Sequence, residues 1–180
     1  MHLKPKPMKK YYVLTALIAV VFMAGTPQYL IAQSTKGAMR VGGQLGYGTQ
    51  IESLGIGGRF DYAITDQILL APDLMYFFGK SEDGFDWSWF DVNLNGNYVF
   101  SISNPDIIPY ALAGINIAFL SYSYDIPGDY GDGGDTEIGL NLGGGADFKV
   151  GNLFVFGELR FATTSDDQLV IAGGVKFPIN

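Results

Sequence analysis

Cysteine is absent from the 180 residues, and histidine occurs once, as His2. The lack of cysteine excludes disulfides and every thiol-based site. Charged residues make up only 16% of the chain, whereas a soluble domain usually carries about 25%. The composition also argues against intrinsic disorder, because 13 Phe, 11 Tyr and 2 Trp are too much apolar surface to leave unburied.

Long hydrophobic runs are also missing after the N-terminal segment, so we expect no transmembrane helix in the mature chain. Residues 1–32 have the three parts of a secretory signal peptide: a basic region, an apolar stretch over 11–25 and a small-residue exit at Ala32, with Ala24 as the second candidate. The alternative is an uncleaved signal anchor, but the apolar stretch is short for a spanning helix, which needs about 20 residues. The sequence therefore predicts an exported protein that begins near residue 33.

The one histidine of the chain would be removed together with the signal peptide. Because His2 lies in the predicted signal peptide, the mature chain has no histidine base, and catalytic triads that need one are excluded. We therefore expect no enzyme. Acidic residues Asp125, Asp129, Asp132 and Asp135 are spaced unlike an EF-hand, so we predict no metal and no cofactor.

The charge is divided unevenly along the chain. Four of the eleven basic residues fall in the first ten positions, and the first 32 residues hold no acid. The remainder therefore carries seven basic against 18 acidic residues. An acidic surface repels phosphate, so nucleic acid is not an expected partner.

Alternation of apolar and polar residues is what repeats in the mature chain, and it predicts an all-β protein. The expected strands are 39–48, 54–64, 68–78, 90–100, 108–122, 136–148, 153–161 and 169–177. Two of them alternate less cleanly. Pro72 predicts a weak point or bulge in 68–78, because proline cannot donate to a ladder. In 108–122, Asn116 assigns Ile115, Ile117 and Phe119 to the apolar face.

Short connections alternate with longer, acidic ones at 79–86 and 123–135. Eight strands with this alternation predict an eight-stranded antiparallel up-and-down transmembrane β-barrel over 33–180, with the two longer loops displayed outside. The nearly unbroken apolar face suits lipid, whereas the other face is rich in glycine and asparagine and suits a narrow interior.

Aromatic residues fall near both ends of the strands, as in the interfacial girdles of membrane barrels. Near the short turns are Tyr62, Tyr98, Phe100, Tyr110, Phe148 and Phe177. Near the longer loops are Tyr47, Tyr76, Trp89, Phe119, Tyr122 and Phe161.

Charged residues on the polar parity predict an ion-pair network in the lumen, because an unpaired buried charge is costly. The middle layer is expected to hold Arg59, Asp61, Asp73, Glu158 and Arg160. A second layer, nearer the short turns, holds Arg40, Asp147 and Lys176, while Asp91 and Glu137 are expected near the outer rim. These residues either fill and satisfy the lumen or form a polar gate. Because eight strands leave room only for side chains, we predict no open pore.

The sequence resembles the small eight-stranded outer-membrane barrels of the OmpA/OmpX and opacity type over about residues 37–177. The resemblance rests on the signal peptide, the strand count, the strand opening PYALAG at 109–114 and the ending GGVKF at 173–177. That ending is similar to the signal by which the outer-membrane assembly machinery recognises its clients, although here the chain continues through Pro178 to Asn180.

The leading hypothesis is an integral, monomeric outer-membrane barrel with a plugged polar lumen and a structural or surface-interaction role. Its expected partners are outer-membrane lipid and, during biogenesis, the assembly machinery. Two alternatives remain: a narrow channel or export-assembly component, and a soluble secreted barrel that binds an apolar ligand.

Overall fold

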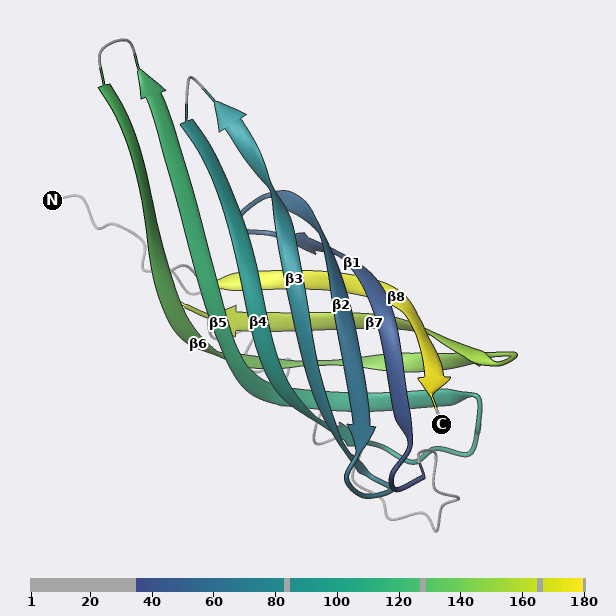
Figure 1. Cartoon of the computed structure of the whole chain (residues 1–180). Helices are drawn as coiled ribbons and strands as arrows, with labels where there is room; N and C mark the ends of the chain where they lie inside the picture. Colours follow the sequence, from purple (N-terminus) through teal and green to yellow (C-terminus); the bar gives the residue numbers. More distant parts are fainter. Residues whose placement is uncertain (1–34, 83–84, 127–128, 165–166, 180) are drawn as a thin grey trace, which may run out of the picture.

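The computed structural model describes residues 35–82, 85–126, 129–164 and 167–179, so the predicted signal peptide lies outside the described residues. Eight strands make up the fold (Figure 1): β1 (Met39–Gly48), β2 (Ser53–Ala63), β3 (Ile68–Glu82), β4 (Phe85–Val99), β5 (Ile107–Ile126), β6 (Asp129–Val150), β7 (Leu153–Thr163) and β8 (Gln168–Ile179). Among the described residues, no helix is long and apolar enough to cross a membrane.

The strands form one closed barrel in sequence order, with every neighbouring pair antiparallel. Closure is made by β1 and β8, whose register runs from Met39 opposite Ile179 to Gly48 opposite Val170. A closed barrel pairs the backbone of every strand on both sides, so that no edge remains within the wall. The predicted eight-stranded antiparallel barrel is therefore confirmed.

Pro72 marks a gap in the ladder between β2 and β3. Pairing stops after Arg59 opposite Asp73 and resumes at Tyr62 opposite Leu70 without a change of register. The weak point therefore lies where the sequence predicts it, because proline has no N–H to donate. The bulge lies elsewhere, between Phe77 and Lys80 in the ladder of β3 with β4.

Four strands extend well past the rim of the barrel. β3 and β4 have 15 residues each, β5 has 20 and β6 has 22, whereas β1, β2, β7 and β8 have 10 to 12. Figure 1 shows these hairpins rising beyond the short strands. We call the part of β3–β6 that continues past Phe77 on β3 and Leu140 on β6, where pairing with β2 and β7 ends, the projecting sheet. The predicted loops 79–86 and 123–135 are thus wrong as loops, because most of their residues are paired strand.

The projecting sheet has two edge strands, β3 and β6. Pairing of β2 with β3 ends at Gly55 opposite Phe77, and pairing of β7 with β6 begins at Leu140 opposite Thr163. Above these points β3 and β6 each have one described strand neighbour. The glycine and aspartate content of these segments disfavours strand, but hairpin pairing across β4 and β5 holds them extended.

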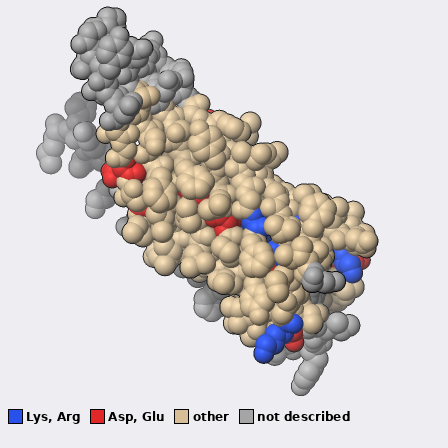
Figure 2. All heavy atoms as spheres, in the orientation of Figure 1, with Lys and Arg blue, Asp and Glu red and all other residues tan. Residues whose placement is uncertain are grey.

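Along the barrel wall, burial alternates residue by residue. Asn93 is 1% exposed and its neighbour Leu94 is 51% exposed. The outward face is mainly Leu, Ile, Val and aromatic residues, and Figure 2 shows few charged atoms on the wall. On β3 this face runs from Ile68 to Phe78, a height of about 25 Å at about 3.4 Å per residue and a tilt of about 40°. That height matches the apolar band of a membrane barrel.

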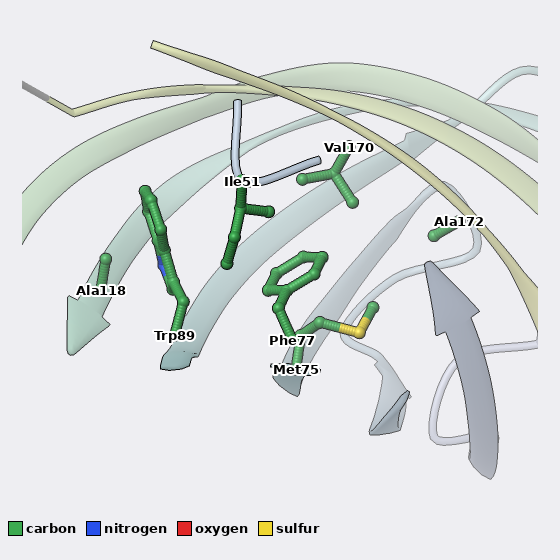
Figure 3. Close-up of a cluster of buried hydrophobic side chains, with 7 residues drawn as sticks. All are labelled: Ile51, Met75, Phe77, Trp89, Ala118, Val170 and Ala172. Atoms are coloured by element: carbon green, nitrogen blue, oxygen red, sulfur yellow. The ribbon is translucent and has the colours of Figure 1, made fainter. Parts of the chain in front are cut away.

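Inside the barrel, two apolar clusters lie at opposite ends. The hairpin-end cluster, below the projecting sheet, consists of Ile51, Met75, Phe77, Trp89, Ala118, Val170 and Ala172 (Figure 3). The turn-end cluster, near the short turns, consists of Ala63, Leu69, Val99, Ile108, Tyr110, Leu112 and Phe154. Between them lies the polar middle of the lumen.

Candidate functional site

Eight buried charges in the lumen are joined in one chain of ion pairs. At its turn end, Asp147 accepts from Arg40 at 2.8 Å and from Lys176 at 2.8 Å. Lys176 also reaches Asp61 at 2.7 Å, and Asp61 contacts Arg59 at 3.3 Å. The remaining links are Arg59–Glu158 at 2.6 Å, Glu158–Arg160 at 3.7 Å and Arg160–Asp73 at 2.8 Å.

Positive and negative groups alternate along this chain, so that its formal charge is zero. This matters because a buried charge without a partner is costly, whereas a paired and hydrogen-bonded one is tolerated. The two predicted layers are brought together, since Lys176 bridges Asp147 of one layer and Asp61 of the other. The side chains come from β1, β2, β3, β6, β7 and β8, so the network ties together strands on both sides of the seam where the barrel closes.

Inward aromatic rings border the ion pairs. The Tyr110 hydroxyl donates to Glu158 at 2.8 Å. The Arg40 guanidinium lies 4.0 Å from the centre of the Phe154 ring, and Lys176 Nζ lies 4.8 Å from that of Phe156. Such cation–π contacts add to the ion pairs. Phe154 and Phe156 were not among the predicted site residues, although they share the parity of Glu158 and Arg160 on β7.

Asparagines fill the opposite side of the lumen. Asn93 and Asn95 on β4 each donate to Asp73 at 3.0 Å. Asn116 on β5 donates to the Asn93 oxygen at 2.9 Å, and Asn141 on β6 donates to the oxygens of Asn93 and Asn95 at 2.8 and 2.9 Å. These amides form a second network, which the charged residues alone do not predict. The asparagines nevertheless occupy the polar parity of their strands, so the sequence pattern places them in the lumen.

Asp73 is the residue at which the two networks meet. Its carboxylate accepts from Arg160 at 2.8 Å and from Gln44 at 3.1 Å, in addition to the two asparagines. An ionised carboxylate accepts several hydrogen bonds at once. Asp73 therefore couples the ion-pair chain to the asparagine network.

The two charges expected near the rim lie differently. Asp91 is buried, and its carboxylate accepts from the Trp89 indole nitrogen at 2.5 Å. It therefore sits where the polar middle adjoins the hairpin-end cluster. Glu137 is half-buried, on the part of β6 that belongs to the projecting sheet.

Two of the twelve predicted girdle aromatics do not face outward. Trp89 and Tyr110 are each 4% exposed and belong to the hairpin-end and turn-end clusters, respectively. The prediction failed here because both ends of the lumen are apolar, so an aromatic residue near a strand end fits either face. The other ten are exposed or half-buried: Tyr47, Tyr62, Tyr76, Tyr98, Phe100, Phe119, Tyr122, Phe148, Phe161 and Phe177.

Metal-ligating groups are not gathered in the part of the chain that the structure describes, which has no cluster of three or more His, Asp or Glu side chains suited to a metal ion. The side chains of Asp125, Asp129 and Asp132, considered in the sequence as calcium ligands, lie outside the described set. What the lumen offers is a charge-balanced chain of eight ion-paired side chains and an adjoining network of asparagines, between two apolar clusters.

No protein-family model matches the sequence, and no curated protein matches it. Solved structures do resemble the fold. The N-terminal β-barrel domain of Pseudomonas aeruginosa OprF has a TM-score of 0.59 at 18% identity, covering 81% of this chain and 100% of that one.

Ail, the attachment invasion locus protein of Yersinia pestis, has a TM-score of 0.58 at 13% identity, with 81% of this chain and 100% of that chain covered. A major outer membrane protein from Thermus thermophilus has a TM-score of 0.62 at 13% identity, with coverages of 79% and 98%. The chain therefore has the fold of the small eight-stranded outer-membrane β-barrels.

Proposed function

We propose that this protein is an integral barrel of the bacterial outer membrane, with a structural or surface-interaction role carried by the projecting sheet. The observation that carries the proposal is the division of the molecule into an apolar wall about 25 Å high and a four-stranded sheet that continues beyond it. The wall provides the anchor, and the sheet provides the surface that is displayed.

The apolar wall supports lipid as the surrounding medium. A belt of leucine side chains around the barrel is more than half exposed, including Leu45, Leu94, Leu140 and Leu159. Soluble proteins rarely expose contiguous apolar patches of such extent. The same arrangement argues against a soluble barrel with an apolar binding cavity, which would turn these residues inward. The outward-facing Phe177 near the end of β8 supports recognition by the outer-membrane assembly machinery.

The projecting sheet supports a surface role. On β6, residues 129–139 have β5 as their one described strand neighbour, and the backbone of such an edge strand can pair with another extended chain. Ail, whose fold is similar, is an attachment invasion locus protein. The partner class that suits such an edge is an extended segment of another protein, bound as an added strand.

The filled lumen supports a plug rather than a channel. Across its middle run the ion pairs and amide hydrogen bonds, and apolar clusters lie on either side. Single-channel recording in planar bilayers tests this: we expect no stable openings, and reproducible ion-sized steps would favour the channel alternative.

Surface display is tested by labelling intact cells. Asp135→Cys on the projecting sheet and Asn152→Cys in the turn at the opposite end, both exposed, are treated with a membrane-impermeant maleimide. The chain has no other cysteine, so each variant reports one position. We expect the thiol at position 135 to react on intact cells and the thiol at position 152 only after lysis. Reaction of both in the soluble fraction, or the reverse order, would contradict the proposal.

A further inference from the structure

The connection between β1 and β2, residues 49–52, turns back into the barrel instead of standing in solvent. Ile51 at its centre is 1% exposed and belongs to the hairpin-end cluster. Figure 3 shows its side chain descending between Trp89 and Val170, above Phe77. A turn residue thus completes the apolar lining of the barrel mouth.

Three hydrogen bonds join this turn to β8. The Ile51 backbone N–H donates to the side chain of Gln168 at 3.3 Å, and the Thr49 N–H donates to the Leu169 carbonyl at 2.9 Å. The Leu169 N–H in turn donates to the Thr49 hydroxyl at 3.2 Å. All three hydrogen bonds reach the start of β8, whereas Ile51 meets Phe77 and Trp89 on β3 and β4 through apolar contact.

Backbone strain accompanies the inward position of Ile51. Glu52 has a φ of 49°, and it is the one non-glycine residue with positive φ in the described part of the chain. Such a conformation is unfavourable for a residue with a Cβ and persists only when surrounding contacts impose it. A Cβ at Gly48, on the other side of the turn, would lie 2.5 Å from Ile51 Cγ2, so a side chain there would require Ile51 to shift.

We propose that residues 49–52 form a lid and that Ile51 is its stopper, which reversibly leaves the apolar pocket lined by Phe77, Trp89 and Val170. Opening turns the chain about Gly48 and Glu52 and relieves the positive φ of Glu52, while the tether to β8 keeps the lid at the barrel mouth. The open lid exposes an apolar pocket on the side of the barrel that carries the projecting sheet.

The test measures the accessibility of residue 51 in the folded, vesicle-embedded protein. Ile51→Cys is labelled with a water-soluble maleimide, with Gln50→Cys, an exposed neighbour, as the control. We expect the thiol at position 51 to react at least tenfold more slowly than the thiol at position 50, but still to completion. Unheated samples should migrate as a folded barrel throughout the reaction. A rate difference of about that size reflects a minor open state.

A second pair of substitutions separates a lid from a fixed part of the core. Glu52→Ala and Glu52→Gly both remove the side chain, but only glycine tolerates positive φ without strain. In the Ile51→Cys background we expect Glu52→Gly to label roughly fivefold more slowly than Glu52→Ala, because relief of strain favours the closed lid.

Three results would overturn the proposal. A thiol at position 51 that reacts as fast as the one at position 50 would show that residue 51 is not buried. A thiol at position 51 that reacts only as fast as the whole barrel unfolds would show that no lid moves. Equal labelling rates of the glycine and alanine variants at position 52 would show that the strain is not coupled to opening.

Trp89 gives a readout that needs no thiol label at residue 51. In a Trp87→Phe background Trp89 is the sole tryptophan, since the chain has two. We expect acrylamide to quench its fluorescence less in Glu52→Gly than in Glu52→Ala, and more when Ile51 is replaced by glycine. Quenching that is the same in all three variants would also overturn the proposal.

Discussion

The inner and outer faces of the barrel wall differ far more than their shared strands suggest. On β4, the Asn93 amide is bound to Asp73, Asn116 and Asn141, whereas the adjacent Leu94 points away from the protein. Inside, a polar side chain such as Asn93 shares hydrogen bonds with several others, so its removal leaves their donors or acceptors without a partner. Outside, a side chain mainly contacts the medium around the barrel. Substitutions on the two faces should therefore fail for different reasons.

The largest effect is expected at Asp73, the junction of the two lumen networks. Asp73→Ala leaves Arg160 without its nearest anion and removes the acceptor of Gln44, Asn93 and Asn95. We expect the free energy of unfolding in lipid vesicles, measured by urea titration, to fall by about 3–5 kcal/mol. Asp73→Asn, which keeps one acceptor oxygen, should lose less. A loss below about 1 kcal/mol for Asp73→Ala would mean that the networks do not stabilise the barrel.

The second-largest loss of stability is expected from a charge on the outer face. Leu94→Arg places a guanidinium midway along the outward side of β4, and such a substitution near the bilayer midplane costs about 2–4 kcal/mol. The control is Gln67→Arg, in an exposed turn, where surface substitutions change stability by no more than about 0.5 kcal/mol. Equal stability of both variants in vesicles would show that water, not lipid, meets this face.

The smallest effects come from one methyl group added on either face. At Gly143 a Cβ would lie 2.2 Å from the Leu159 carbonyl oxygen, whereas at Gly58 its nearest neighbour would be 3.9 Å away. We expect Gly143→Ala to lower the free energy of unfolding by about 1–3 kcal/mol and Gly58→Ala to change it by less than about 0.5 kcal/mol. Similar losses in the two variants would remove the distinction between a crowded inner face and an open outer one.

The alternation of residues was sufficient to predict the strands, their number and the faces of most of them, because one buried and one lipid-facing side leave a strict period of two. It was not sufficient near the strand ends. Trp89 and Tyr110 obey the inward parity of their strands, but the ends of the lumen are as apolar as the wall outside, so residue type does not separate the faces there.

The charged lumen residues could be selected by parity, but their connections could not. Lys176 reaches both Asp61 and Asp147 because the tilt of the strands brings different residue levels together inside the barrel. The extent of the projecting sheet was also missed, since the glycine- and aspartate-rich segments of β6 have little strand propensity and are held by pairing with β5.

The most direct test of the two-faced wall is the environment of a nitroxide label at Leu94→Cys in lipid vesicles, measured by electron paramagnetic resonance. Asn152→Cys, in an exposed turn, gives the reference for water. If the outer face lies against lipid, the label at position 94 collides often with oxygen, which partitions into the bilayer, and rarely with a water-soluble nickel chelate. A label at position 94 that meets the nickel chelate as often as the label at position 152 would contradict the account.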